Sequence, residues 1–211
     1  MIFDLVFIVV VVATVVMLAM AAIAGLRGRR QRATSLLLRC GVVSAIYLGG
    51  VVVVSLLSPQ RVLAIGEDWC FDDWCIAVDS VTFASELGPS GHPVKANGVF
   101  YVVRLRLSNH ARGRPQRATS AAVHLLDGLG HRYEVSHDGQ SAYEAQDGPT
   151  PPLTSTVPIG RSVTTVRLFD LPRDARQVGL TVEHPVGFSP GVFVIGDQAS
   201  LFHRRTVVRL N

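Results

Sequence analysis

The sequence predicts a two-helix transmembrane hairpin followed by an all-β antiparallel sandwich. Two long apolar runs near the N-terminus predict the helices, and an arginine-rich connector separates them. Beyond Pro59 the pattern changes to short runs of alternating apolar and polar residues with turn residues between them, which is typical of strands. A chain of 211 residues is long enough for this hairpin and one further domain.

The two apolar runs cover residues 5–26 and 40–60, and neither contains a charged side chain. Each run reaches the roughly 18–20 residues that a helix needs to span a bilayer. We expect the helices over about 3–26 and 36–57. A secretory signal peptide is the alternative for the first run, but the acidic Asp4, the length of the run and the arginines after it favour a retained helix.

The connector between the runs, residues 27–35, and the start of the second helix are rich in arginine and contain no acid. The net charge of +4 is concentrated here, because basic and acidic residues are equal in number from residue 58 onward. Short basic loops stay on the cytoplasmic side of a membrane. We therefore expect a two-pass protein of the cell (inner or plasma) membrane with both termini extracytoplasmic. The arginines that carry this topology signal are Arg27, Arg29, Arg30, Arg32 and Arg39.

This organisation divides the chain into a helix hairpin at 1–57 and an extracytoplasmic β domain at 58–211. The β domain has no net charge, so it lacks the basic footprint that nucleic-acid binding requires, and we expect no nucleic-acid partner. The bilayer itself is an expected partner, and the connector arginines could also attract anionic lipid headgroups.

Small residues recur at four-residue spacing in both predicted helices, with Ala21 and Gly25 in the first and Gly41, Ala45 and Gly49 in the second. Small residues at this spacing let helix backbones approach closely within a membrane. We expect the two helices to pack through these faces. A homo-oligomer formed through one of them is the competing use.

Beyond the helices, apolar residues alternate with polar ones in several short runs. The clearest strand is 99–109, where Val103, Leu105 and Leu107 share one face and Arg104 and Arg106 the other. No window outside the apolar runs shows a convincing helical period, so seven or so strands predict an antiparallel sandwich. Two longer loops are expected at 87–98 and 136–160, the second either functional or partly mobile. The remaining predicted strands are 75–84, a hairpin over 121–135 that turns near Asp127-Gly128, 162–172, 177–184, 191–197 and 201–210.

A succession of features over residues 75–184 resembles a known family. A long strand ends in Ser108-Asn109 before a basic, Pro-containing loop, an Asp-Gly hairpin follows at 127–130, a Pro-Ile-Gly turn at 158–160, and a strand closes with Phe169-Asp170-Leu171-Pro172. This order is similar to the telokin-like, immunoglobulin-fold domains of unknown function in bacterial exported proteins. The resemblance implies an immunoglobulin-like sandwich with a binding or scaffold role and no shared catalytic residues. That family is usually tied to the surface by a lipid or one helix, so the hairpin anchor departs from it.

The stretch WCFDDWC at 69–75 opens the β domain. Disulfides form and persist outside the cytoplasm, so we expect Cys70 and Cys75 to be bonded across a tight turn. Such a bridge would hold the turn and set the direction of the flanking tryptophans. Those tryptophans are either core residues or, if exposed, an interfacial anchor or a binding patch. The possible binding patch consists of Trp69, Asp72, Asp73 and Trp74.

Four kinds of chemistry fit the residues poorly. The plan of the chain resembles the copper-bearing subunit of haem-copper oxidases, but the cysteine spacing differs and all three methionines lie within the first 20 residues. A serine–lysine hydrolase would depend on Lys95, which has no nucleophile box near it. His124 and His131 supply two ligands where zinc needs three or four. The acids around WCFDDWC have no EF-hand spacing for calcium. We therefore expect no metal, no cofactor and no catalytic residues.

The sequence thus predicts a membrane-anchored, extracytoplasmic binding or scaffold domain that is not an enzyme. Its partner would be a neighbouring protein or a component of the envelope, with an identity that the residues do not name. Two alternatives stay open. One is a redox-responsive envelope protein that uses Cys70 and Cys75. The other is an accessory subunit of a larger membrane complex, held through the helix hairpin.

Overall fold

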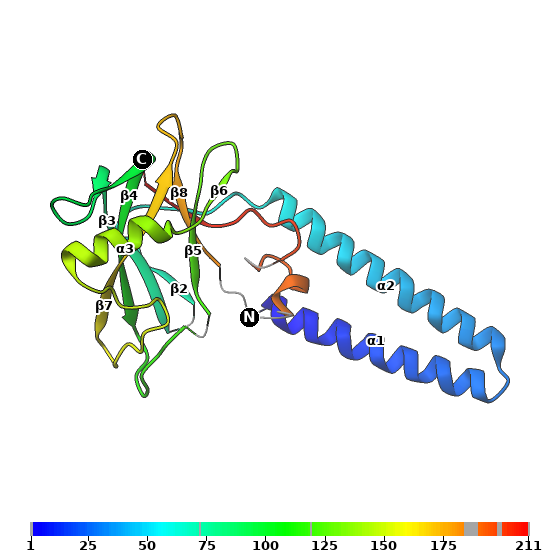
Figure 1. The fold of residues 1–211 in the computed structure, drawn as a ribbon. Coiled ribbons are helices and arrows are strands. Elements are labelled where there is room, and N and C mark those ends of the chain that lie inside the picture. The colour runs from blue at the N-terminus through cyan, green and yellow to red at the C-terminus, as the bar shows by residue number, and fades with distance from the viewer. Residues whose placement is uncertain (1, 72, 119, 184–189, 198–199, 211) are drawn as a thin grey trace. The chain divides into compact units, whose positions relative to one another are not determined.

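The computed structural model describes residues 2–71, 73–118, 120–183, 190–197 and 200–210, and it forms two compact units. One unit contains the helices α1 (Ile2–Leu26) and α2 (Arg30–Leu57). The other contains two β-sheets and one helix, and begins at Arg61 (Figure 1). The predicted architecture of two N-terminal helices followed by a β-sandwich is therefore confirmed at this level. The immunoglobulin-like assignment stays a prediction.

The two helices are joined by a turn of only three residues, Arg27–Arg29. Gly28 adopts φ +73°, and the N–H groups of Gly28 and Arg29 bond to the carbonyls of Gly25 and Ala24. A glycine in this conformation is the usual way to end a helix. The connector expected at 27–35 is shorter than predicted because Arg30 and the residues after it are already helical.

The prediction that the helices pack through their small residues is wrong for all but Ala21, which is buried. Gly25, Gly41, Ala45 and Gly49 are exposed, and no atom lies within 4 Å of a Cβ built on any of the three glycines. The covered face of α2 lies to one side of them and uses other side chains, spaced four, three, four and four residues apart along the helix. These residues are Cys40, Ser44, Tyr47, Val51 and Ser55. A homo-oligomer through the outward-facing small residues stays a prediction.

A segment near the C-terminus belongs with the helices and not with the sandwich. The strand expected at 191–197 is wrong, because Pro190–Phe193 form a short 3-10 helix, η1. The Tyr47 hydroxyl donates to the carbonyl of Phe193 at 2.9 Å, and the hydroxyls of Ser55 and Ser200 lie 2.7 Å apart. The apolar run GVFVIG packs on apolar helices, and a run this short does not distinguish a strand from other buried segments. The domain expected over 58–211 therefore excludes this segment.

The sandwich consists of two sheets, and most neighbouring strands are antiparallel (Figure 1). One sheet has the order β2-β3-β4-β7 and the other β1-β9-β8-β5-β6. The β1–β9 pair is parallel, which the antiparallel prediction did not include. The strands are β1 (Val62–Leu63), β2 (Trp69–Phe71), β3 (Trp74–Leu87), β4 (Val94–Asn109), β5 (Ala122–Leu126), β6 (Arg132–Tyr133), β7 (Ser162–Leu171), β8 (Gly179–Glu183) and β9 (Val207–Arg209).

Most predicted strands are confirmed, with shifted ends. The strand predicted over 99–109 starts earlier, at Val94, so the loop expected over 87–98 shrinks to 88–93. The hairpin over 121–135 is formed by β5 and β6 and turns at Asp127 as predicted. The last predicted strand, 201–210, is reduced to the three residues of β9.

Alternation along β4 explains the core. Tyr101, Val103, Leu105 and Leu107 are buried and join the central apolar cluster, while Arg104 faces outward. Leucines and valines of β5, β8 and β9 close the cluster from the second sheet. Each fully buried side chain of this size contributes about 1.5–3 kcal/mol relative to an exposed one. The two sheets are therefore held together mainly by this single apolar layer.

The helix α3 (His137–Asp147) is the main element that the sequence did not predict, since a loop was expected over 136–160. Ser136 caps it, because its hydroxyl accepts a hydrogen bond from the N–H of Gly139 at 3.1 Å. The helix packs on the outer face of β4 and β7, where Phe100 and Leu168 are almost fully buried. Strands with apolar residues on both faces need such a cover.

Candidate functional site

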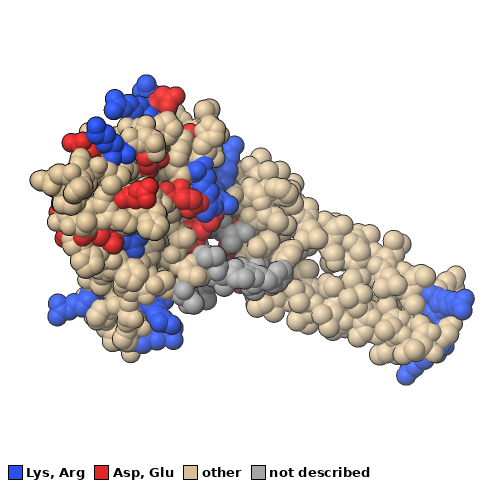
Figure 2. Space-filling view, in the orientation of Figure 1, with Lys and Arg blue, Asp and Glu red and all other residues tan. Residues whose placement is uncertain are grey.

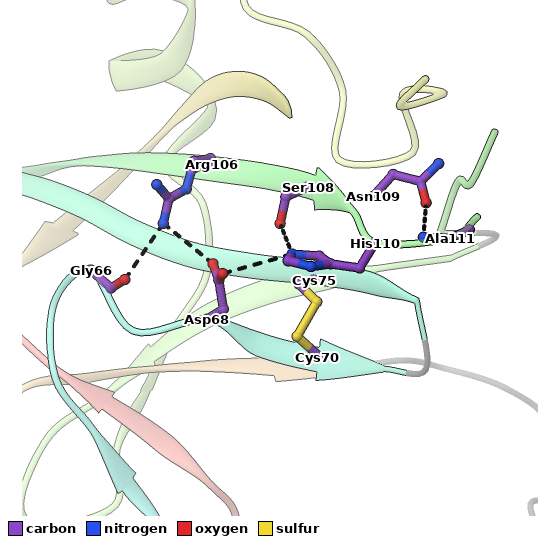
Figure 3. The surroundings of a disulfide bond; sticks show 9 residues. All are labelled: Gly66, Asp68, Cys70, Cys75, Arg106, Ser108, Asn109, His110 and Ala111. Carbon is purple, nitrogen blue, oxygen red and sulfur yellow. Dashed lines mark hydrogen bonds and ion pairs between the residues drawn. A yellow bond between two sulfur atoms is a disulfide. The ribbon is translucent and has the colours of Figure 1, made fainter. Parts of the chain in front are cut away.

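The stretch WCFDDWC forms a β-hairpin at one edge of the first sheet (Figure 3). The register pairs Trp69 with Ile76, Cys70 with Cys75 and Phe71 with Trp74. Cys70 and Cys75 form the expected disulfide, with their Cα atoms 3.9 Å apart. This separation is close to that of a non-hydrogen-bonded cross-strand pair. Of the two acids at the turn, Asp73 is exposed and Asp72 lies outside the described residues.

The two tryptophans are core residues. Each is only 4% exposed, and both belong to the central apolar cluster. The Phe71 ring lies between them, with its centroid 5.2 Å from that of Trp69 and 5.9 Å from that of Trp74. Side chains alternate along a strand, so the disulfide lies on the opposite face of the hairpin from these rings, where Cys70 is exposed and Cys75 is buried. The binding-patch hypothesis is therefore wrong for Trp69 and Trp74, since neither ring can reach a partner.

The outward face of the hairpin adjoins an open groove of about 640 Å³. Arg106 of β4 is anchored in it, with its Nη2 3.3 Å from Asp68 Oδ1 and its Nε 3.6 Å from Asp79 Oδ1. His110 Nε2 lies 3.8 Å from the other oxygen of Asp68 and 3.3 Å from the Ser108 hydroxyl (Figure 3). The Arg106 guanidinium thus lies beside two carboxylates, so this wall of the groove is polar and its guanidinium is already paired.

Asn109, the last residue of β4, holds the two loops that form the rest of the groove. Its side chain is buried, and its amide nitrogen donates to the carbonyls of Arg114 at 3.1 Å and Val157 at 3.0 Å. Its amide oxygen accepts from the N–H of Ala111 at 2.8 Å. Gln116 and Val157 exchange two backbone hydrogen bonds across the same loops, of 3.0 and 2.8 Å. The basic loop after β4 is thereby clamped to the loop before β7.

A second polar cluster organises the turn between β5 and β6. The Asp127 carboxylate accepts hydrogen bonds from the backbone N–H groups of Leu129 and His131, from the Tyr133 hydroxyl and from the His131 ring. Partial burial raises the pKa of Asp127, but these donors outweigh it and lower the pKa to about 2. His131 is largely exposed whereas His124 is fully buried, so the two histidines do not share one face.

A third cluster fastens α3 to the sheet. Gln140 donates to Glu144 at 2.8 Å and to the Thr150 hydroxyl at 2.9 Å. Hydrogen bonds from Thr150 and Gln140 lower the pKa of Glu144. Arg167 donates to the Pro151 carbonyl at 2.9 Å, and burial lowers its pKa while Glu144 raises it. The hydrogen bonds of Gln140, Thr150 and Arg167 are made within the fold, so this cluster serves to hold α3.

Within the described ranges, no group of three or more His, Cys, Asp or Glu side chains could hold a metal ion. Sequence reasoning noted the basic loop after β4 but missed Asn109, the residue that organises it. The available signal was a polar side chain at an inward position of the strongest alternating strand, since Leu105, Leu107 and Asn109 share one face.

No protein-family model matches the sequence, and no curated protein matches it. Solved structures similar to the chain include three bacterial proteins. The yjhA protein from Bacillus subtilis shares 14% identity over 71% of this chain and 99% of its own, with a TM-score of 0.48. An uncharacterized beta-sandwich protein from Clostridium difficile 630 shares 13% over 73% and 96%, with a TM-score of 0.44. The secreted protein MPT63 from Mycobacterium tuberculosis shares 13% over 61% and 93%, with a TM-score of 0.43. These similarities assign neither a family nor a function, and the telokin-like resemblance stays a prediction.

Proposed function

We propose that the chain is a membrane-anchored protein whose β-sandwich lies outside the cytoplasm and acts as a non-catalytic binding or scaffold domain. The observation that carries the proposal is the outer surface of α1 and α2. Only 6% of the most apolar stretch of α1 and 17% of that of α2 is buried within the fold. Leu38 and Ile46, for example, are each 71% exposed. A core helix of a soluble protein would bury these side chains, whereas a bilayer solvates them.

The side of the membrane that we propose for the sandwich rests on charge and on disulfide chemistry. The turn at Arg27–Arg29 and the first turn of α2 carry exposed arginines (Figure 2). Basic residues in a short loop favour the cytoplasmic side. The Cys70–Cys75 disulfide belongs to the other unit, and such bonds persist mainly in oxidising compartments. Both features therefore favour a sandwich on the extracytoplasmic side.

The binding role is supported by the loops at one end of the sandwich. Asn109 and the Gln116–Val157 bridge clamp them beside the open groove. Loops held rigidly on a sheet are common binding surfaces, because little conformational entropy is lost when a partner docks.

Cysteine labelling in intact cells tests the topology. In a Cys40→Ala background the disulfide leaves no free thiol, so single reporters can be added at exposed sites, Thr34→Cys on α2 and Ala145→Cys on α3. We expect a membrane-impermeant maleimide to label the α3 reporter in intact cells and the α2 reporter only after permeabilisation. The opposite pattern would overturn the proposal, as would recovery of the full-length chain without membranes.

A second candidate function is a redox-responsive hairpin, favoured by the exposure of Cys70. Exposed disulfides are the ones that thiols can attack. Incubation of the full chain in a mildly reducing glutathione buffer, followed by thiol labelling, tests it. Loss of the Cys70–Cys75 bond would support the redox function, and a bond that stays oxidised would exclude it.

A further inference from the structure

The groove end of the sandwich concentrates positive charge. Four arginines lie on its two clamped loops, and we call them the arginine surface: Arg112, Arg114, Arg117 and Arg161. Neither residues 110–121 nor residues 153–162 contain an acid, although the sandwich as a whole is electrically balanced. Figure 2 shows basic but no acidic side chains at the lower end of the sandwich in that view. The charge of the domain is therefore segregated, not absent.

The guanidinium groups of the arginine surface are available to a partner. All four residues are exposed. Among the described residues, ion pairs hold Arg106 to Asp68 and Asp79, and Arg132 to Glu134 and Glu183, but none involves the arginine surface. Asp68 lines the same groove as Arg112 and Arg161, but Arg106 already engages its carboxylate. Among the residues that the structure describes, acids therefore pair with Arg106 and none pairs with the arginine surface.

The backbone beneath these arginines is built to stay in place. Arg114 is fixed through its carbonyl, which accepts from the buried Asn109 side chain at 3.1 Å. Arg161 is fixed by two backbone bonds, because its carbonyl accepts from the Asn109 N–H and its N–H donates to Pro158, both at 3.1 Å. Arg112 and Arg161 line the same groove, together with the hydroxyl-bearing Ser108 and Ser162. A cationic surface on a rigid backbone costs little entropy to engage.

The exposure and number of these arginines indicate what kind of anion they bind. An exposed arginine binds a single anion weakly, because water and salt screen the pair. Several such arginines side by side become effective only when their anions are linked, since each later contact is then intramolecular. Guanidinium forks match phosphate oxygens, and hydroxyl groups in the groove can donate to the same oxygens. We propose that the arginine surface binds a linear polymer carrying repeated phosphate groups. This inference rests on the proposed function, because it requires the sandwich to face the envelope where such a polymer would lie.

Binding of inorganic polyphosphate to the full chain tests the inference. The protein is reconstituted in nanodiscs of phosphatidylcholine, and dye-labelled polyphosphate is titrated by fluorescence anisotropy over a range of salt concentrations. One variant replaces all four arginines of the arginine surface with glutamine. A matched control makes the same charge change with four exposed residues elsewhere on the sandwich: Lys95→Gln, Arg104→Gln, Arg176→Gln and Arg209→Gln.

We expect wild-type affinity to fall with salt at a log–log slope of about −3, as four phosphate contacts would give on a single-stranded polyanion. The arginine-surface variant should lose at least about tenfold in affinity and most of that slope, while the control stays within about twofold. Equal losses in both variants would reduce the effect to net charge and overturn the inference. So would competition by inorganic monophosphate at the same total phosphate concentration, since a linked ligand would then be unnecessary.

Further outcomes distinguish a phosphate polymer from a lipid headgroup as the ligand, and failure of this inference from failure of the proposed function. If phosphatidylglycerol nanodiscs alone protect the arginine surface from phenylglyoxal, the ligand is the bilayer headgroup and the polymer is excluded. Failure of polyphosphate binding together with extracytoplasmic labelling at Ala145→Cys overturns the inference alone. If polyphosphate binding depends on the four arginines but Ala145→Cys is labelled only after permeabilisation, the arginine surface is supported and the proposed extracytoplasmic location is overturned.

Discussion

Removal of the Asn109 side chain should destabilise the sandwich and loosen the arginine surface together. Asn109→Ala deletes three hydrogen bonds and leaves the N–H of the buried Ala111 without its acceptor. A buried orphan donor costs about 1–3 kcal/mol, and each of the other two bonds contributes a net ~0.5–1.5 kcal/mol. The Val157 carbonyl keeps its bond from Gln116, and water can reach the exposed Arg114. We therefore expect a loss of about 2–3 kcal/mol in the free energy of unfolding.

Intrinsic tryptophan fluorescence makes this loss measurable in the full chain. The protein has only two tryptophans, and both lie in the sandwich core, so the signal reports the sandwich without the helices. In urea titrations in a non-ionic detergent, an m-value near ~2 kcal/mol/M converts the expected loss into a midpoint lower by about 1–1.5 M.

Asn97→Ala is the matched control, because Asn97 is exposed and its side chain makes one bond, to Asp170 at 3.0 Å. Exposed substitutions of this kind usually change stability by less than about 0.5 kcal/mol. A midpoint for Asn109→Ala within about 0.3 M of the control would refute the clamp, since the buried bonds would then contribute nothing that water does not replace.

Three further changes test other parts of the fold with the same urea assay. Ser136→Ala should lower the free energy of unfolding by about 0.5–2 kcal/mol because it removes the cap of α3. Far-ultraviolet circular dichroism should show a loss of helix. An unchanged urea midpoint would contradict the capping role. Gly98→Ala should lower the free energy of unfolding by more than about 3 kcal/mol, because its Cβ would lie 2.1 Å from the Leu171 carbonyl oxygen and β4 and β7 would have to separate. The control Gly113→Ala places its Cβ in open space and should leave stability unchanged. The pKa of Asp127 is about 2 in the fold against an ordinary value of 3.8, so its contribution to stability is present above pH ~4 and is lost as the pH falls toward 2. Asp127→Asn should lower the midpoint at pH 6 and flatten the acid limb of the stability profile. Parallel pH profiles for the variant and the wild type would exclude this role.

The alternating strands and the disulfide were predictable because local rules decide them. Leu105 and Leu107 alternate with Arg106, and the two cysteines that we expected outside the cytoplasm have a short loop between them. The direction of Trp69 and Trp74 was not predictable, because a shift of one residue in strand register reverses both faces. The alternatives of core and binding patch could be separated only by the pairing of Cys70 with Cys75.

Other elements depended on information that no local window contains. The polar sequence of α3 has little apolar periodicity, and its best signal lay elsewhere, in the outward apolar residues Phe100 and Leu168 that needed a cover. The helix-packing prediction failed because Gly41 and Gly49 match a close-packing motif, yet they are exposed. A neighbouring face of α2 is the one that is covered. Clamping of the basic loop by Asn109 joins residues 48 positions apart, a separation that spacing rules do not address.

The placement of β9 bears on how the chain matures. This strand follows every other described strand in the sequence, yet it occupies an interior position in its sheet, between β1 and β8. Until Val207 and Val208 emerge, β1 and β8 both present open edges to other chains. Folding during synthesis can thus assemble β2, β3, β4 and β7 early, but the second sheet is completed only after β9 has been synthesised. Chains that stop before Val207 should be cleared or aggregate, so synthesis of β9 is the step that completes this domain.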